Sequence, residues 1–253
     1  MATSTVERVP VIFLPGILMP AALRYERLLQ ALGDDVDAVT KDLEVYLGPS
    51  VPPPEYSLEI ELEGIAHAAD EHGFARFHLY GHSGGGACAL AFTATHADRV
   101  LTLALDEPAI DFSPEDLQEI RDVFLPMLEL PPEELGREFV RTMFRTGVEP
   151  PPRPEGPPPP WMADRPAGVA AFVRALNEAD VPVERLRTFD RPVYYSYGSL
   201  SNETWERKAK RLADVFPNIT VELYEGLSHM NTSHVAEPER VAAALRRLWG
   251  RPR

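Results

Sequence analysis

A single serine stands among glycines in the segment 79–90, which reads LYGHSGGGACAL. An apolar run ends at Gly81, Ser83 follows two residues later, and a helix-forming stretch begins at once. A strand that turns sharply into a helix at a serine strains the backbone there and exposes the hydroxyl. Gly81 and Gly85 leave room for the neighbouring backbone to approach closely. In this setting, the G-x-S-x-G pattern predicts that Ser83 is a nucleophile.

A serine hydroxyl needs a base to accept its proton, and the C-terminal segment YEGLSHMNTSH offers two histidines. His229 lies a few residues past the last predicted strand, where a loop at the sheet edge can bring its imidazole to Ser83. His234 lies nearer the following helix, and we interpret it as a surface or capping residue. His82 adjoins the serine, but we expect its side chain to point away from the serine oxygen. His229 is therefore the predicted base.

The elements that must hold these residues alternate between short β-rich runs and amphipathic helical patterns, which is typical of a parallel sheet with crossover helices. The predicted strands are Val9–Leu14, Val36–Leu43, Arg76–Tyr80, Arg99–Leu105, Pro192–Tyr197 and Ile219–Tyr224. The predicted helices of this core run from about Pro20 to Leu32, from a cap at Ser57 to Gly73, onward from Ser83, over Asn202–Phe216 and over Pro238–Trp249.

The section between Pro108 and Asp190 breaks this alternation, because it contains only helical patterns. They cover Pro114–Leu125, Pro132–Arg145 and Arg165–Asn177. The segment EPPPRPEGPPPP, residues 149–160, cannot be helical and should be extended, as either a rigid strap or a mobile hinge. We expect residues 1–107 and 190–253 to form an α/β core and residues 108–189 to form a helical cap on its carboxyl edge.

Composition and charge restrict the partners. The 253 residues carry a formal net charge of −14, which disfavours binding to nucleic acid or to anionic membrane surfaces. The N-terminus has no basic-then-apolar signal pattern, and no apolar run reaches the roughly 18 residues of a membrane span. The one cysteine, Cys88, forms no intrachain disulfide, and the seven scattered histidines indicate no metal site. We expect a soluble cytoplasmic protein that acts on a small molecule.

The chain resembles the α/β-hydrolase family through its FLPG turn, the GHSGGG segment, the helical insertion and the terminal GLSH. The resemblance implies a Ser–acid–His triad in that chain order, no cofactor, and an oxyanion hole formed by the N–H groups of Ile17 and Gly84. Pro15 stands where relatives commonly have a His-Gly pair. The residues before Val9 are too few for the family's opening antiparallel hairpin, so we expect a sheet of about six strands, mostly parallel.

The acid of the triad has three candidates. Relatives often place an aspartate after the penultimate strand, where this chain has Ser201, which we interpret as the N-cap of the next helix. Other relatives place the acid one strand earlier, where VLTLALDEPAI ends with Asp106 and Glu107. Strand alternation and the resemblance favour Glu107, with Asp106 second. Glu203 is a third candidate if its loop bends inward.

The insertion is rich in apolar side chains, which predicts a hydrophobic acyl or alcohol group in the substrate. The residues expected to contact the substrate are Gly16, Leu18, Met19, His82, Trp161 and Met230. The sequence therefore predicts a serine hydrolase that cleaves a carboxylic ester or lactone. The alternatives are a thioesterase, an acyltransferase, a C–C hydrolase or a lyase using the same residues, or a non-catalytic ligand-binding protein with this fold.

Overall fold

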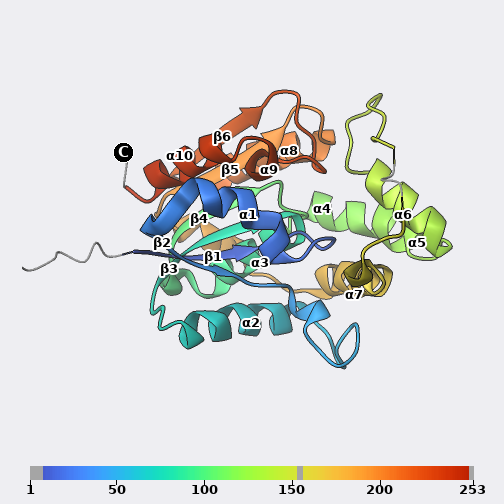
Figure 1. Ribbon diagram of the computed structural model, residues 1–253, viewed down its shortest axis with the longest axis horizontal. Helices are drawn as coiled ribbons and strands as arrows, with labels where there is room; N and C mark the ends of the chain where they lie inside the picture. Colours follow the sequence, from blue (N-terminus) through green and yellow to red (C-terminus); the bar gives the residue numbers. More distant parts are fainter. Residues whose placement is uncertain (1–7, 153–155, 251–253) are drawn as a thin grey trace, which may run out of the picture.

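The computed structural model describes residues 8–152 and 156–250, and within them six strands form one parallel sheet in the order β2-β1-β3-β4-β5-β6 (Figure 1). The strands are β1 (Val9–Leu14), β2 (Val36–Thr40), β3 (Phe77–His82), β4 (Val100–Asp106), β5 (Val193–Gly198) and β6 (Ile219–Tyr224). The predicted fold class, an α/β sheet of about six strands flanked by helices, is confirmed.

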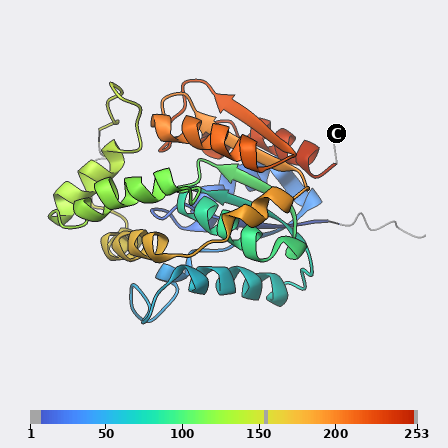
Figure 2. The same cartoon turned by 180° about the vertical axis from the view of Figure 1, so that it is seen from behind.

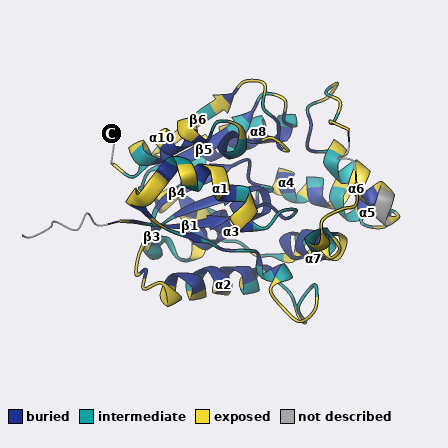
Figure 3. Ribbon diagram, in the orientation of Figure 1, coloured by how far each residue is buried: buried dark blue, intermediate teal, exposed yellow. Residues whose placement is uncertain are grey.

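The central strands have apolar side chains on both faces because helices cover both sides of the sheet. Helices α1 (Ala21–Leu32) and α10 (Pro238–Leu248) pack on one face, and α2 (Leu58–Glu71), α3 (Ser83–Thr95) and α8 (Glu203–Val215) pack on the other (Figures 1 and 2). Burial is nearly complete along β3, β4 and α3, whereas the edge strand β6 is partly exposed (Figure 3). The start of α3 is therefore held rigidly at the centre of the molecule.

The segment between β4 and β5 forms the helices α4 (Pro114–Glu119), α5 (Leu125–Met127), α6 (Pro132–Arg141) and α7 (Arg165–Glu178). They lie together at one end of the sheet, beyond the carboxyl ends of the strands (Figure 1). The first predicted helix of this segment is interrupted, since a π-helical turn (Ile120–Phe124) joins α4 to α5. Of the predicted extended segment, residues 153–155 lie outside the described part of the chain.

Two helix starts, those of α2 and α8, differ from the sequence prediction. Ser57 precedes α2 but makes no side-chain capping bond. The first turn of α1 is capped from elsewhere in the chain, by Asp42 Oδ1, which accepts a hydrogen bond of 2.6 Å from Ala21 N–H. Asn202, not Ser201, caps α8, since its side-chain oxygen accepts a hydrogen bond of 2.9 Å from Thr204 N–H. None of the helices in the described residues has the length and apolar character that a membrane span requires.

Candidate active site

Ser83 is the first residue of α3 and follows β3 directly, in a backbone conformation that side chains rarely adopt (φ 51°). A Cβ at Gly81 would overlap the backbone of Gly85, and a Cβ at Gly85 would overlap the backbone of Leu14. The two glycines therefore let the turn pack against strand β1. Its sharpness directs the Ser83 hydroxyl away from the sheet edge, and the strain at this residue is typical of a functional position.

Three predicted residues lie in one hydrogen-bonded chain. The Nε2 atom of His229 lies 2.9 Å from Ser83 Oγ, and its Nδ1 atom lies 2.7 Å from Glu107 Oε2. The other oxygen of Glu107 accepts a hydrogen bond of 2.7 Å from the backbone N–H of Gly198. Glu107 and His229 are buried, and Glu107 also has a positive φ of 48°. A carboxylate in this position requires the proton on Nδ1, which leaves the Nε2 lone pair facing the serine.

The other candidates for the acid lie elsewhere. Asp106 bonds to a different histidine, and Glu203 Oε1 accepts a hydrogen bond of 3.3 Å from Thr146 N–H in the inserted segment. Ser201 is buried and its Oγ has no hydrogen-bond partner among the described residues. Of the acidic candidates, the structure brings Glu107 alone to His229.

Trp205 is part of this site and was missed by the sequence analysis. Its indole ring stacks on the His229 imidazole, with ring centroids 4.2 Å apart and an interplanar angle of 10°. Its Nε1–H donates to the Pro108 carbonyl over 3.1 Å, which fixes the ring. A stacked aromatic ring limits imidazole rotation and stabilises the protonated form through its π electrons. The sequence signal, one tryptophan in the first turn of an amphipathic helix, does not distinguish this role from core packing.

Gly84 and Ile17, the two residues predicted to form the oxyanion hole, lie next to each other beside Ser83. Gly84 lies in the first turn of α3, where N–H groups have no acceptor within the helix. Ile17 N lies 3.5 Å from the position that a Cβ on Gly84 would occupy, so the two residues adjoin. The Ile17 carbonyl accepts hydrogen bonds from Tyr46 Oη (2.9 Å) and Arg165 Nη1 (3.3 Å). These two side chains, which sequence reasoning missed, hold the loop on which a hole at Ile17 and Gly84 depends.

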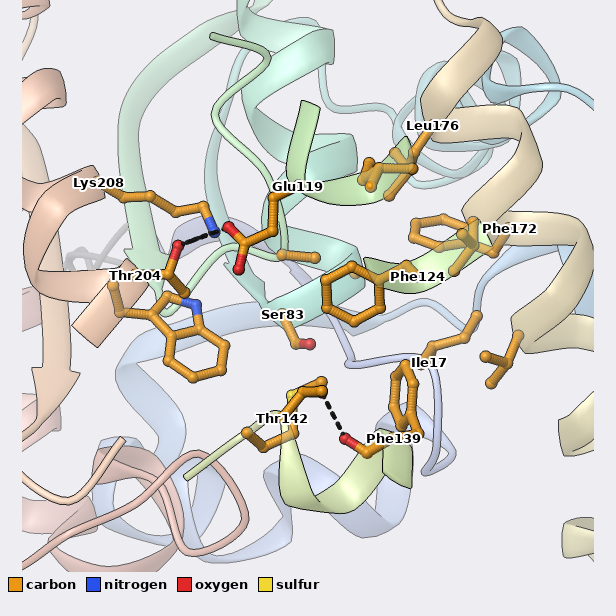
Figure 4. A pocket seen from close by; sticks show the side chains of 17 residues that line it. Ile17, Ser83, Glu119, Phe124, Phe139, Thr142, Phe172, Leu176, Thr204 and Lys208 are labelled. Carbon is orange, nitrogen blue, oxygen red and sulfur yellow. Dashed lines mark hydrogen bonds between the residues drawn. The ribbon is translucent and has the colours of Figure 1, made fainter. Parts of the chain in front are cut away.

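Two chambers meet at Ser83. The large chamber spans about 670 Å³, part of it open to solvent, and is lined mainly by apolar side chains of the inserted helices, including Phe124, Phe139, Phe172 and Leu176 (Figure 4). Polar groups lie on its opposite wall, where Thr204 Oγ1 donates to Glu119 Oε2 over 3.1 Å and Lys208 Nζ approaches Thr204 Oγ1 at 3.4 Å (Figure 4).

The small chamber spans about 390 Å³, part of it open to solvent, on the side of Ser83 where His229 lies. The predicted contact residues in its lining are Gly16, Leu18, Met19, His82 and Met230. The prediction for Trp161 is wrong: this residue lines neither chamber and packs against Arg165, whose Nε donates to the Trp161 carbonyl. The guanidinium of Arg165 lies between the Trp161 and Tyr46 rings and so keeps Trp161 away from the cavity.

The comparison with family models decides the family. The model described as "Alpha/beta hydrolase family" matches residues 11–244. The chain belongs to the α/β-hydrolase family. No curated protein sequence matches it. The identity to similar solved structures is too low to indicate more than a shared fold.

The solved structures similar to this hydrolase include a thermophilic esterase from Thermogutta terrifontis, with 21% identity and a TM-score of 0.72 over 96% of this chain and 89% of that one. The α/β hydrolase MGS-M2 from a deep-sea metagenome library has 14% identity and a TM-score of 0.73 over 100% and 93% of the two chains. MenH from S. aureus has 17% identity and a TM-score of 0.65 over 97% and 95%.

The hydrolase contains a second carboxylate–histidine pair beside the first. His234, predicted to be a surface or capping residue, is fully buried, and its Nδ1 lies 2.6 Å from Asp106 Oδ2. Ser196 and Ser233 donate hydrogen bonds to the same carboxylate over 3.0 and 2.9 Å. The prediction was wrong because α9 (Ser233–Ala236) turns this histidine inward, onto the end of β4. The pair contacts neither Ser83 nor the chambers, so we assign it a structural role.

His82, Asp106 and His234 lie close enough together for one ligand atom from each to approach a common metal ion. The donor set does not fit a cation, however, because the Arg24 guanidinium occupies this region. Arg24 Nη2 lies 2.7 Å from His82 Nε2, while His82 Nδ1 lies 3.1 Å from the Asp106 carbonyl oxygen. His82 therefore donates through Nδ1 and accepts through Nε2 as a neutral ring.

The buried histidines predict that the hydrolase loses stability in acid. Burial, together with the Arg24 charge, lowers the pKa of His234 to about 4, and burial lowers the pKa of His82 well below its ordinary value. The unfolded chain takes up these protons below pH about 6.5, whereas the folded chain does not. The stability is therefore complete above pH 6.5 and falls as the pH is lowered towards 4.

We expect the free energy of unfolding, measured with urea, to fall by about 2 kcal/mol between pH 7 and pH 4.5 from His234, with a further loss from His82. His67→Gln, at an exposed position, should leave the slope unchanged. A free energy that stays level across this window would contradict the assignment of both rings as buried and neutral.

Proposed function

We propose that this chain is a serine hydrolase that cleaves a carboxylic ester or lactone through an acyl-enzyme. The observation that carries the proposal is the continuous hydrogen-bonded chain from Ser83 Oγ through His229 to Glu107, with two chambers opening at its serine end. A serine hydroxyl within bonding distance of an imidazole that is oriented by a carboxylate is the arrangement required for acyl transfer.

In the first half-reaction, Ser83 Oγ attacks the substrate carbonyl carbon while His229 Nε2 accepts the serine proton. The carbonyl oxygen becomes an oxyanion, which the N–H groups of Ile17 and Gly84 stabilise by donating hydrogen bonds to it. The tetrahedral intermediate then collapses, its bond to the leaving oxygen breaks, and His229 returns the proton to that oxygen. Glu107 stabilises the imidazolium throughout.

In the second half-reaction, water attacks the acyl carbon of the ester on Ser83, and His229 Nε2 accepts a proton from it. Collapse of the second intermediate returns the electron pair and the proton to Ser83 Oγ and releases the carboxylic acid. In a lactone the leaving oxygen stays attached to the acyl chain, so that one hydroxy acid is released. The atoms balance with water as the second substrate.

The positions of the chambers assign the two parts of the substrate. His229 must reach the leaving oxygen, and His229 lines the small chamber but not the large one. We therefore place the leaving alcohol in the small chamber and the acyl chain in the large one. Its wall of phenylalanine and leucine side chains favours a hydrophobic acyl group.

The test of this proposal is covalent labelling combined with a substrate panel. We expect a fluorophosphonate to label Ser83 at neutral pH, with the modified peptide identified by mass spectrometry. A panel of activated esters, lactones and thioesters should then give the highest kcat/KM with an oxygen ester or lactone. A protein in which Ser83 stays unlabelled would instead be a ligand-binding member of the family. A preference for thioesters would correct the leaving atom but not the mechanism.

A further inference from the structure

Arg24 is a cation beside Ser83 that forms no ion pair with any of the described residues. It lies on α1 and is the only permanently charged side chain among the described residues that line the small chamber. None of the carboxylates in the described residues comes within 4.0 Å of its guanidinium, although the chain carries a net charge of −14. An arginine that is half-buried without a carboxylate has lost hydration without gaining an ion pair, so its presence here requires another explanation.

The guanidinium is held in place by two neutral acceptors. Its Nη2 atom lies 2.7 Å from His82 Nε2 and 3.0 Å from Thr232 Oγ1. These two bonds use both hydrogens of Nη2. Nη1 makes no hydrogen bond to any described residue, and Nε is buried without a partner. One edge of the group is thus fixed, while Nη1 is left with no acceptor among the described residues.

The nearest acidic groups do not neutralise this charge at the chamber. Asp106 and Glu107 are each 1% exposed and are absent from the lining of the small chamber. The oxygens of Asp106 accept from Ser196, Ser233 and His234, as described above. Both carboxylates attract Arg24 through space. An anion within the small chamber would nevertheless contact the guanidinium and not these carboxylates, because, of these three side chains, only Arg24 lines the chamber.

We propose that the alcohol released by this enzyme carries a carboxylate, which Arg24 binds in the small chamber. This inference rests on the proposed function, because the leaving group is assigned to that chamber through His229. A carboxylate would supply the acceptors that Nη1 lacks, and a charge-assisted bond to a prepositioned arginine is stronger than one between neutral groups. The enzyme would then select its substrate by an apolar acyl group on one side of Ser83 and an anionic alcohol on the other.

The experiment compares two esters of nearly the same shape whose leaving groups differ in charge, 4-carboxyphenyl hexanoate and 4-carbamoylphenyl hexanoate. In the unaltered protein we expect kcat/KM to be at least about 10-fold higher for the carboxylate ester. In Arg24→Gln that ratio of kcat/KM values should fall to about 1. Arg24→Lys should retain part of the ratio, because lysine keeps the positive charge but lacks the planar set of guanidinium donors. The control is Arg27→Gln, one turn further along α1 and exposed, which should keep the full ratio.

A second measurement uses the unaltered protein alone, so it does not depend on the folding of the variants. The free products 4-hydroxybenzoate and 4-hydroxybenzamide are compared as protectants of Ser83 against a fluorophosphonate. We expect the benzoate to slow labelling at a concentration at least about 10-fold lower than the benzamide.

The outcomes separate the two proposals. If Ser83 is labelled and esters are cleaved, but the carboxylate ester and the benzoate have no advantage, the role of Arg24 is wrong and the hydrolase assignment stands. If Ser83 is neither labelled nor acylated, the hydrolase assignment fails and the anionic leaving group fails with it.

Discussion

Replacing Ser83 by alanine is expected to lower kcat for a good ester substrate by about 10⁴- to 10⁶-fold, the loss typical of removing a triad nucleophile. The reason is specific to the geometry. Ser83 Oγ is the atom that His229 Nε2 approaches at 2.9 Å, and alanine leaves that nitrogen without a proton to accept. The measurement is the initial rate of p-nitrophenyl butyrate hydrolysis, together with a burst experiment that detects the acyl-enzyme.

The matched control is Ser201→Ala, which removes a buried hydroxyl from the loop after β5. The oxygen of Ser201 has no hydrogen-bond partner among the described residues, so its loss should leave both kcat and the urea midpoint close to those of the unaltered protein. Both variants should give the same far-ultraviolet spectrum. Turnover by Ser83→Ala at the rate of the unaltered protein would remove the nucleophile from the mechanism.

The positions of Ser83 and His229 could be predicted because both depend on where strands end. In a parallel sheet the carboxyl ends of all strands lie at one edge, and loops after different strands meet there. Sequence alternation identified β3 and β6 closely enough to place both residues at that edge. Glu107 was harder to predict, because two consecutive acids end β4 and only the backbone conformation decides which one turns towards His229.

Side chains brought in by helix packing were not predictable in the same way. His234 reaches Asp106 because a short helix, α9, follows a loop whose path no local pattern specifies. Trp205 stacks on His229 only because α8 packs beside the loop that carries the histidine. Trp161 was expected in the cavity on its apolar character alone, and it was misplaced because Arg165 offers it a competing contact. Each case depends on distant contacts that composition and periodicity do not encode.

The register of the sheet explains why an acid after β4 suits this site. His82 pairs with Asp106 across β3 and β4, so Ser83 and Glu107, the next residues, leave neighbouring strands at the same level. Both have a positive φ, which turns their side chains out of the strand direction. His229 then bonds to both side chains at the carboxyl edge of the sheet, to Ser83 through Nε2 and to Glu107 through Nδ1. The end of β5 lies beside this acid, since the N–H of Gly198 donates to Glu107 Oε1.

Replacing Glu107 by glutamine is expected to lower kcat by about 10³- to 10⁴-fold, because it inverts the hydrogen-bonding pattern around His229. Gly198 N–H requires an acceptor at one end of the side chain, so the amide oxygen stays there and the amide nitrogen faces His229 Nδ1. Nδ1 must then act as an acceptor, which places the ring proton on Nε2. An Nε2–H faces Ser83 as a donor and cannot accept the serine proton.

The change of tautomer in Glu107→Gln has a kinetic signature that simple destabilisation of the fold lacks. Fluorophosphonate labelling of Ser83 should slow in parallel with kcat, while KM for the ester and the urea midpoint change little. Glu203→Gln removes a carboxylate that accepts from Thr146 N–H instead, and it should retain full activity. If Glu203→Gln were the inactive variant and Glu107→Gln the active one, the loop after β5 would supply the acid and the order of the triad along the strands would have to be reassigned.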